Sequence, residues 1–215
     1  RFRIPMPEVV RQLRDAGLDS IPGGGGEILV DAVRERVAKK KAQTEEWLGV
    51  QEEAHRQGMR TSVTMMYGMG ESNADRIEHL LKIRDLQART GGFTAFICWP
   101  LQPAGTPMFD GTAKTDAVTY LRTLAMGRII CRNIPNMQSS WVTMGHKVGQ
   151  VALRFGANDY GSLMMEENVV SQAGSVHCAT TELEVRATIE AAGFRAARRD
   201  SWYRRLAPAL GGSAP

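Results

Sequence analysis

The chain has 215 residues, of which 43% are hydrophobic and 23% charged, the balance of an ordinary globular protein. Its 27 Lys and Arg residues exceed its 23 Asp and Glu residues, which gives a net charge of +4. Three cysteines are too few for a secreted disulfide framework, and we expect neither a membrane span nor a leader. Only Trp202 and Tyr203 lie among the tail arginines, too few aromatic residues for stacking nucleic-acid bases. The composition predicts a reduced, cytoplasmic protein with no nucleic-acid or membrane partner.

Glycine and proline residues divide the chain into alternating helical and extended patterns. Helical patterns are predicted, in chain order, over 7–16, 28–37, 44–57, 73–90, 114–131, 145–155 and 181–192. Strand-like segments are predicted over 18–21, 60–67, 93–99, 137–143 and 157–162, and the third reads as a strand buried on both faces. Strand, helix and parallel strand, repeated about five times, is typical of an α/β fold with a parallel sheet.

The start of the chain points to a longer protein. Residue 1 is Arg, and the first methionine, Met6, already lies at the edge of a helical pattern. Five strand–helix units are also too few for a closed eight-stranded barrel, which takes about 250 residues. We therefore expect either an open sheet or part of a barrel, in one domain over residues 1–206, followed by a disordered tail over 207–215.

Two glycine-containing segments follow the first two predicted strands, where parallel α/β folds place their chemistry. Each segment is either a tight turn or a place where backbone amides approach a ligand. The first has neither the Gly-Lys-Ser/Thr ending of a Walker loop nor the acid spacing of a Rossmann fingerprint, so nucleotide hydrolysis is not expected. The candidate ligand-binding residues are Pro22, Gly23, Gly24 and Glu27 in the first segment and Gly68, Gly70 and Glu71 in the second.

The ends of the later strands are rich in amide, hydroxyl, carboxylate and aromatic side chains. Groups this polar in a half-buried segment must bond to one another or to a ligand, and we interpret them as a ligand pocket. Trp99 is either a core side chain or a ligand platform, and His177, in a predicted loop, is a candidate acid or base. The candidates are Trp99, Gln102, Gln138, Ser140, Asn158, Asp159, Glu166 and His177.

The cysteines and the helical histidines carry no predicted site. Cys98, Cys131 and Cys178 are far apart in the sequence, so no local metal cluster is expected. His55 and His79 fall in predicted helices, where we expect surface positions.

Several sequence blocks carry a resemblance to a known family. They are LDSIPGGGGEIL at 18–29, TMMYGMGE at 64–71, TGGFTAFICW at 90–99, NIPNMQSSWVT at 133–143, GANDYGS at 156–162 and EENVV at 166–170. Together they resemble the cyclic dehypoxanthinyl futalosine synthases, radical S-adenosylmethionine enzymes of the futalosine route to menaquinone. The resemblance covers roughly residues 8–205.

The resemblance implies a TIM-type barrel with a four-iron four-sulfur cluster that an electron donor reduces. In such enzymes the cluster cleaves S-adenosylmethionine to a 5′-deoxyadenosyl radical, which takes a hydrogen from the sugar of dehypoxanthine futalosine before the spiro ring closes. The family's Cys-x-x-x-Cys-x-x-Cys motif is absent here, and the first block resembles the fourth strand of the barrel. The chain therefore resembles strands four to eight, without cluster ligands, and we expect it to be inactive alone.

The resemblance also implies roles for the candidate residues. The segments 22–27 and 68–71 would face S-adenosylmethionine. The residues implied for the substrate pocket are Trp99, Gln102, Gln138, Ser140 and Asn158. Asp159, Glu166 or His177 would supply the base of the final deprotonation.

Two alternatives stay open at the level of sequence. The related aminofutalosine synthase and deazaflavin-forming synthase share the glycine and Gly-Ala-Asn/Asp-Asp themes, although the Ser-Trp-Val-Thr block fits the cyclase better. A half-barrel that keeps the ligand loops but only binds, without catalysis, is the other alternative.

Overall fold

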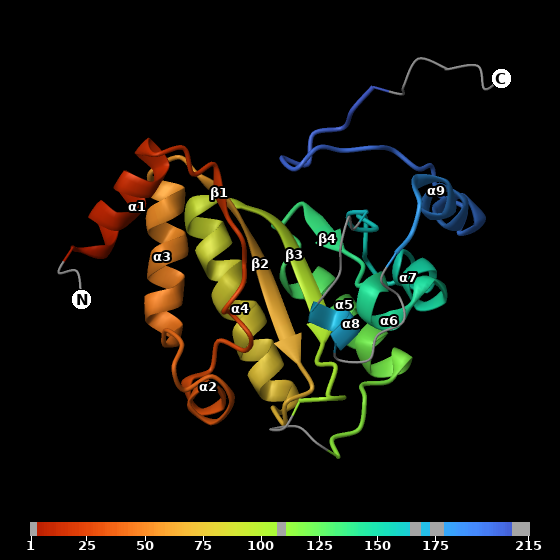
Figure 1. Ribbon diagram of the computed structural model, residues 1–215, viewed down its shortest axis with the longest axis horizontal. Helices are drawn as coiled ribbons and strands as arrows, with labels where there is room; N and C mark the ends of the chain where they lie inside the picture. The colour runs from red at the N-terminus through yellow and green to blue at the C-terminus, as the bar shows by residue number, and fades with distance from the viewer. Residues whose placement is uncertain (1–3, 107–110, 164–168, 173–178, 208–215) are drawn as a thin grey trace.

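The computed structural model describes residues 4–106, 111–163, 169–172 and 179–207 (Figure 1). Four parallel strands form one sheet in the order β1-β2-β3-β4. The strands are β1 (Ser20–Ile21), β2 (Arg60–Tyr67), β3 (Phe93–Pro100) and β4 (Asn136–Gln138). The helices are α1 (Met6–Asp15), α2 (Asp31–Val37), α3 (Thr44–Arg56), α4 (Asn73–Thr90), α5 (Ala117–Ile130), α6 (Trp141–Met144), α7 (His146–Ala152), α8 (Val169–Gln172) and α9 (Glu182–Ala191). The alternation of helices and parallel strands that the sequence predicts is confirmed.

The last two predicted strands are shorter than expected. The strand predicted over 137–143 ends at Gln138, because Trp141–Met144 forms the short helix α6. The strand predicted over 157–162 is reduced to one parallel bridge between Gln138 and Asp159. Most of the tail predicted over 207–215 lies outside the described residues.

Side chains alternate between two environments along β2. Val63, Met65 and Tyr67 are fully buried and belong to the main core, which also holds side chains of α3, α4 and α5. Burial of each such side chain contributes about 1.5–3 kcal/mol. Ser62, Thr64 and Met66, which alternate with them, are only half-buried. One face of the sheet is therefore the core, and the other is accessible.

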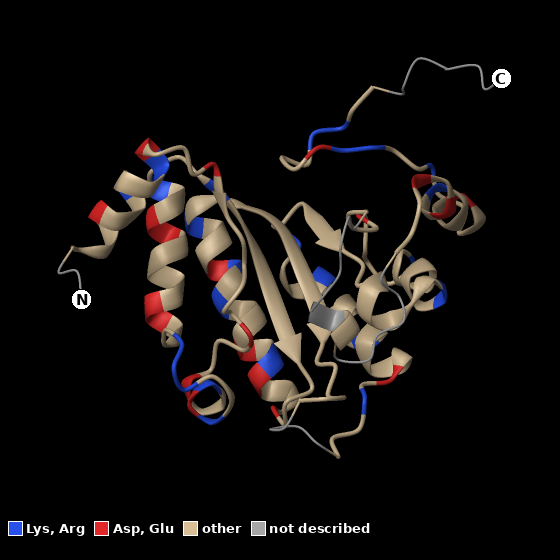
Figure 2. Ribbon diagram, viewed as in Figure 1, with Lys and Arg blue, Asp and Glu red and all other residues tan. Residues whose placement is uncertain are grey.

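Strand β3 also has buried residues on one face and half-buried residues on the other. The prediction that it is buried on both faces is therefore wrong. Thr94, Ile97 and Trp99 are half-buried, whereas Ala95, Phe96 and Cys98 are completely buried. Figure 2 shows that charged residues lie mainly on the helices and the tail, and Arg60 is the single charged residue among the four described strands. A sheet with so few charged residues is typical of a parallel α/β fold, whose strands lie in the interior.

The prediction of surface positions for the two helical histidines is wrong. His79 is completely buried in α4, where its Nδ1 accepts a hydrogen bond from the backbone N–H of Leu29 at 3.0 Å. His55 lies between two threonine hydroxyls, with Nδ1 2.7 Å from Oγ1 of Thr90 and Nε2 2.7 Å from Oγ1 of Thr61. Both histidines therefore hold helices and loops to the sheet.

None of the described helices combines the length and the apolar character that a membrane span requires.

Candidate functional site

The glycine run after β1 lies directly against β2. The N–H of Gly23 donates to Oγ of Ser62 at 3.1 Å, and Oγ1 of Thr64 donates to the carbonyl of Gly23 at 2.6 Å. A Cβ at position 23 would lie 2.5 Å from the backbone nitrogen of Thr64, so only glycine permits this approach. Pro22 and Gly24 are exposed, and a Cβ at Gly24 would meet nothing within 4 Å. Gly23 thus shapes the loop, whereas Pro22 and Gly24 leave its surface open.

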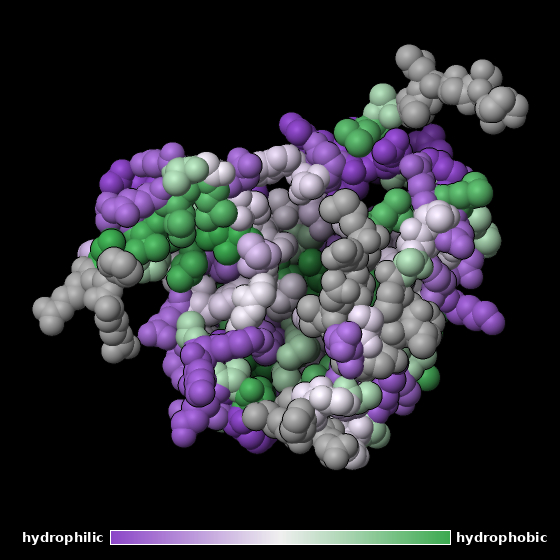
Figure 3. Space-filling view, in the orientation of Figure 1, coloured by the Kyte–Doolittle hydropathy of each residue, from purple (hydrophilic) through white to green (hydrophobic). Residues whose placement is uncertain are grey.

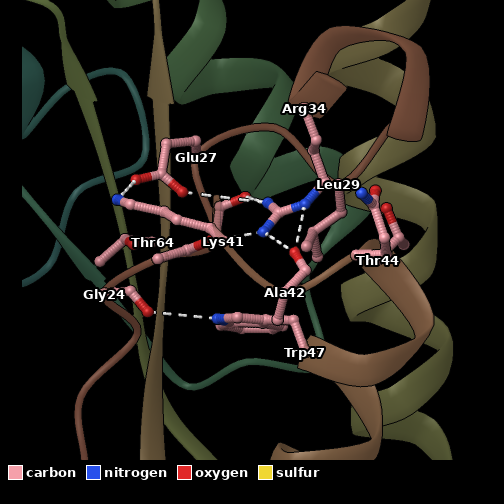
Figure 4. Close-up of polar contacts among 12 residues, drawn as sticks. Gly24, Glu27, Leu29, Arg34, Lys41, Ala42, Thr44, Trp47 and Thr64 are labelled. Carbon is pink, nitrogen blue, oxygen red and sulfur yellow. Dashed lines mark hydrogen bonds and ion pairs between the residues drawn. The ribbon is translucent and has the colours of Figure 1, made fainter. Parts of the chain in front are cut away.

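Glu27 ends this loop with its carboxylate turned inward (Figure 4). Its φ of 33° is a left-handed conformation that costs free energy for a residue other than glycine. Its carbonyl accepts from the N–H of Met66 at 3.1 Å, which fixes the residue beside the carboxyl end of β2. The side chain is 9% exposed; Oε1 accepts from Nζ of Lys41, and Oε2 lies 3.9 Å from Nη1 of Arg34. Among the described residues, that buried Oε2 has no hydrogen-bond partner.

Arg34 supports the loop from beneath. Its side chain is 1% exposed and donates to the carbonyls of Gly25, Gly26 and Ala42, at 3.0 Å from Nη2 to Gly25 and 2.7 Å from Nη1 to Gly26. Burial lowers the pKa of Arg34 from its usual value, yet a guanidinium remains charged in proteins. Because the carbonyls occupy its N–H groups, Arg34 lies near Oε2 of Glu27 without donating a hydrogen bond to it. Oε2 of Glu27 therefore keeps an unused hydrogen-bond acceptor.

The second glycine segment is closed by Glu71. Its side chain is 0% exposed and accepts from the N–H groups of Gly68 at 2.9 Å and Met69 at 2.8 Å. Nε of Arg76 donates to the same carboxylate at 2.8 Å, and its guanidinium carbon lies 4.6 Å from the centre of the Tyr67 ring. Helix α4 begins after Glu71 and takes Ser72 as its N-cap. Glu71 consequently fixes the shape of the loop, while Gly70 is exposed at its tip.

The register of the strands aligns a row of side chains on the accessible face of the sheet. Met66 pairs with Trp99, and Ile97 pairs with Gln138. All four are half-buried. The sequence analysis singled out Trp99 and Gln138 but missed Met66 and Ile97, although the alternation of residues along each strand places them on the same face. This row forms the floor of the candidate site, and the loop of Glu27 contacts β2 at Met66.

Three further predicted residues make their hydrogen bonds inside the protein. Oγ of Ser140 lies 2.7 Å from Oγ1 of Thr143, and Nε2 of Gln102 donates to two neighbouring carbonyls. Asn158 accepts from the N–H of Met137 at 2.8 Å through Oδ1 and donates to the carbonyl of Pro135 at 3.0 Å. These contacts hold strand ends and loops together.

An aromatic stack that the sequence analysis missed stands beside Ser140. The rings of Trp141 and His146 are stacked with centroids 4.9 Å apart, and His146 stacks in turn on Tyr160 at 6.0 Å. Nδ1 of His146 is 2.9 Å from the hydroxyl of Tyr160, and burial raises the pKa of Tyr160 to about 12. Trp99 packs against the same apolar cluster. The stack therefore ties the floor of the site to helix α7.

Asp159 is engaged by the C-terminal tail. Its carboxylate pairs with Arg199, with Nη2 3.2 Å from Oδ1, and Oδ1 also accepts from the N–H of Gly161 at 2.7 Å. Both partners line a cavity of about 790 Å³ between the 157–163 segment, α9 and the tail. In Figure 1 the tail lies at the end of the sheet opposite the arrowhead of β2, away from the carboxyl ends of the strands. The other two predicted acid–base residues, Glu166 and His177, lie outside the described residues.

The described residues offer no metal centre. No three His, Cys, Asp or Glu side chains in the described ranges are grouped as ligands would be. Cys98 and Cys131 are both completely buried, one in β3 and the other directly after α5.

Residues 90–209 match a family described as the CofH/MqnC C-terminal region, and the chain belongs to this family. It is 46% identical to the cyclic dehypoxanthine futalosine synthase of Halalkalibacterium halodurans over 91% of its own length and 52% of that relative. It is 38% identical to the 5-amino-6-(D-ribitylamino)uracil–L-tyrosine 4-hydroxyphenyl transferase 1 of Methanosarcina acetivorans, over 97% of this chain and 57% of that relative. The chain thus spans about half the length of the curated relatives it matches. The predicted resemblance to the cyclic dehypoxanthine futalosine synthases is confirmed.

The fold is also similar to part of a solved structure, that of HydG, a maturase of the [FeFe]-hydrogenase. The two align with a TM-score of 0.63 over 87% of this chain and 42% of that chain. Their sequences are 13% identical, so the likeness concerns the fold alone.

Proposed function

We propose that this chain supplies the C-terminal part of a cytoplasmic radical S-adenosylmethionine enzyme that converts dehypoxanthine futalosine into its cyclic form during menaquinone biosynthesis. The observation that carries the proposal is the 46% identity to a cyclic dehypoxanthine futalosine synthase over 91% of the chain. We assign the sheet to strands four to eight of a (β/α) barrel, with the bridge at Asp159 standing for the last strand.

The iron–sulfur cluster does not fit the residues of this chain. Such clusters are held by cysteine thiolates, and two of the three cysteines are buried in separate elements of the main core. The cluster therefore belongs to the other half of the enzyme, and the chain alone is expected to be inactive.

S-adenosylmethionine does fit the loop that ends at Glu27. The test is the buried Oε2 of Glu27, which has no partner among the described residues and belongs to the same loop as the exposed Gly24. A carboxylate in this position accepts hydrogen bonds from hydroxyl or ammonium groups, and S-adenosylmethionine carries both. When bound and reduced, it supplies the 5′-deoxyadenosyl group that removes hydrogen from the substrate sugar. Pro22, Gly24, Gly68 and Gly70 would surround it with backbone, and Gly23 and Glu71 would hold these loops in shape.

The accessible face of the sheet is proposed to receive the substrate. Trp99 and Met66 offer an apolar platform, and the amide of Gln138 beside Ile97 offers a donor and an acceptor. Gln102, Ser140 and Asn158 form hydrogen bonds within the protein, and we propose that these bonds hold the pocket in shape.

A base must accept the proton that is released after ring closure. Asp159 remains a candidate together with Glu166 and His177. Because Asp159 is paired with Arg199 and with the N–H of Gly161, its geometry favours holding the turn that follows it. Turnover in variants of all three residues would distinguish the base from a positioning residue.

The test uses a chimera in which the part of the Halalkalibacterium halodurans synthase that precedes its match is joined to Arg1 of this chain. The chimera is reconstituted with iron and sulfide and reduced in the presence of S-adenosylmethionine. Formation of the cyclic product from dehypoxanthine futalosine supports the proposal. A product formed only from 5-amino-6-(D-ribitylamino)uracil and L-tyrosine would assign the chain to the sibling activity instead.

A further inference from the structure

Leu29, which follows closely after Glu27, is held by helix α4 through both of its backbone groups. Its N–H donates to Nδ1 of His79 at 3.0 Å, and its carbonyl accepts from Nζ of Lys82 at 2.8 Å. Leu29 and His79 are completely buried, and Lys82 is half-buried. Buried backbone groups need hydrogen-bond partners, and here two side chains of one helix supply them. We call His79 and Lys82 the α4 clamp.

The ring of His79 makes this hydrogen bond and no other within the described part of the chain. Burial lowers the pKa of His79 to about 3, so the ring is neutral near pH 7 and Nδ1 is able to accept. Nε2 has no partner among the described residues. A buried N–H without a partner costs free energy. Packing alone therefore explains a histidine at this position less well than its contact with Leu29 does.

The α4 clamp lies close to a strained residue. The φ of Glu27 is 33°, and a residue other than glycine keeps such a conformation only where its surroundings fix it. On one side, the carbonyl of Glu27 accepts from the N–H of Met66 in β2 at 3.1 Å. On the other side, Ile28 and Leu29 are completely buried, and Leu29 is attached to α4. Without this second attachment, φ would relax toward negative values and the carboxylate would turn away.

Helix α4 also holds the second glycine segment. Arg76, one turn before His79, donates to the carboxylate of Glu71, which closes that segment. One helix therefore fixes both loops that are proposed to bind S-adenosylmethionine. Figure 3 shows hydrophilic side chains at the place of α2, which begins directly after Val30, whereas the α4 clamp holds buried backbone. The clamp can thus set the geometry of the site without forming its surface.

We propose that His79 and Lys82 are positioning residues of the S-adenosylmethionine site, which keep Glu27 in its left-handed conformation by fixing the backbone of Leu29. Neither side chain contacts the ligand, and both act through the carboxylate of Glu27. The inference rests on the proposed function, in which that carboxylate binds S-adenosylmethionine. Loss of the α4 clamp therefore weakens binding and leaves the later steps unchanged, because no reacting atom is touched.

Matched substitutions at His79 in the chimera test the α4 clamp. Asn and Leu have nearly the same shape, but only Asn carries an oxygen close to the position of Nδ1. His79→Asn consequently keeps an acceptor for the N–H of Leu29, and His79→Leu does not. His55→Leu is the control for the loss of a helical histidine, because His55 contacts Thr61 near the start of β2, away from the carboxyl edge.

A second pair of substitutions changes the other half of the α4 clamp at a position where the core is not disturbed. Lys82→Met keeps the aliphatic chain but removes the donor to the carbonyl of Leu29. Glu78→Gln is its control, because it breaks the ion pair between Lys82 and Glu78 and leaves the contact with Leu29 in place. Lys82→Met therefore tests the proposal even if His79→Leu does not fold.

Calorimetry measures the dissociation constant of S-adenosylmethionine for the reconstituted, unreduced chimera, and hydrogen exchange reports on the peptide that contains Leu29. His79→Leu should raise the dissociation constant about tenfold, with kcat at saturating S-adenosylmethionine reduced less than about threefold. Exchange at Leu29 should become about tenfold faster. His79→Asn should restore both quantities to within about threefold of the parent chimera, and Lys82→Met should weaken binding about threefold or more. The two controls should leave binding unchanged.

Three results would overturn the proposal. The first is an unchanged dissociation constant in His79→Leu or Lys82→Met when that variant unfolds cooperatively. The second is equal weakening of binding in His55→Leu, which would show a general loss of stability. The third is a failure of His79→Asn to restore binding, which would show that the hydrogen bond to Leu29 is not the cause.

The parent chimera and Glu27→Gln separate this proposal from the proposed function. A parent chimera that forms no cyclic product would refute the reaction, and weaker S-adenosylmethionine binding in His79→Leu would support the α4 clamp all the same. Weaker binding in Glu27→Gln beside unchanged binding in His79→Leu would refute the clamp alone.

Discussion

The glycine run offers a prediction in which two adjacent, identical substitutions have opposite effects. In Gly23→Ala the new Cβ would lie 2.5 Å from the backbone nitrogen of Thr64 and 2.7 Å from two backbone atoms of Val63. Since these are backbone atoms, β2 or the loop must move, and such overpacking costs about 1–3 kcal/mol. The movement also weakens the hydrogen bonds that Gly23 shares with Ser62 and Thr64, each worth about 0.5–1.5 kcal/mol. We expect a total loss of about 2–6 kcal/mol in the free energy of unfolding.

Gly24→Ala is the matched control. A Cβ there meets nothing within 4 Å, and Gly24 is not among the residues with positive φ. Alanine should therefore stabilise the chain slightly, by about 0.4–1 kcal/mol, through the reduced entropy of the unfolded state. In the chimera, however, the added methyl group should weaken S-adenosylmethionine binding, because it covers exposed backbone.

Urea unfolding of the two variants and the parent chain, followed by circular dichroism, gives the free energies. The reasoning is refuted if Gly23→Ala unfolds within about 1 kcal/mol of the parent, a margin close to the error of extrapolation. Equal losses of free energy of unfolding in the two variants would show that Gly23 and Gly24 are packed equally tightly.

Three further predictions follow from buried ionisable groups. Burial lowers the pKa of His55 to about 4 and that of His79 to about 3. Below pH 6.5 the unfolded chain therefore binds more protons than the folded chain, and stability falls as the pH drops toward these values. Between pH 7 and pH 5, each histidine should lower the free energy of unfolding, measured in urea, by about 2 kcal/mol. His79→Gln should reduce that loss, and an unchanged pH dependence would contradict the assignment. Glu71→Gln leaves the buried Arg76 without its charge partner and should lower the free energy of unfolding by about 3–5 kcal/mol. A loss under about 1 kcal/mol would mean that the pair is solvated. Asp159→Ala in the chimera should reduce turnover about 100-fold. A pH–rate profile that keeps its acidic limb would identify a positioning residue, and near-normal turnover would exclude both roles.

Much of the fold could be predicted from the sequence because local signals and tertiary packing agree there. Strand β2 and helix α4 have the predicted bounds, since period-two burial and the Ser72 cap with Gly91 as terminator mark them clearly. The predicted strand over 137–143 failed because hydrogen bonding around Ser140 starts the short helix α6 instead. The burial of His79 also escaped prediction, because its partner, the N–H of Leu29, is fifty residues away along the chain.

The candidate site, too, could be predicted only in part from the sequence. Position at or after a strand end was enough to single out Gly23, Glu27 and Trp99 as candidates, because the carboxyl ends of parallel strands meet at one edge. The sequence could not tell that Gly23 is required by contact with β2 whereas Gly24 is free, since that depends on a backbone approach across forty residues. It also could not show that Arg34 supports the loop of Glu27, because a lone arginine in a helical pattern is typical of a solvated surface.

The most direct test of the account is the S-adenosylmethionine dependence of the chimera with Glu27→Gln. Loss of a charge-assisted hydrogen bond worth about 1.5–3 kcal/mol should raise the KM for S-adenosylmethionine about 10- to 100-fold. The KM for dehypoxanthine futalosine should not change. Glu182→Gln, at the cavity remote from the carboxyl edge, serves as the control and should alter neither constant. An unchanged KM for S-adenosylmethionine in folded Glu27→Gln would contradict the claim that this edge of the sheet binds the cofactor.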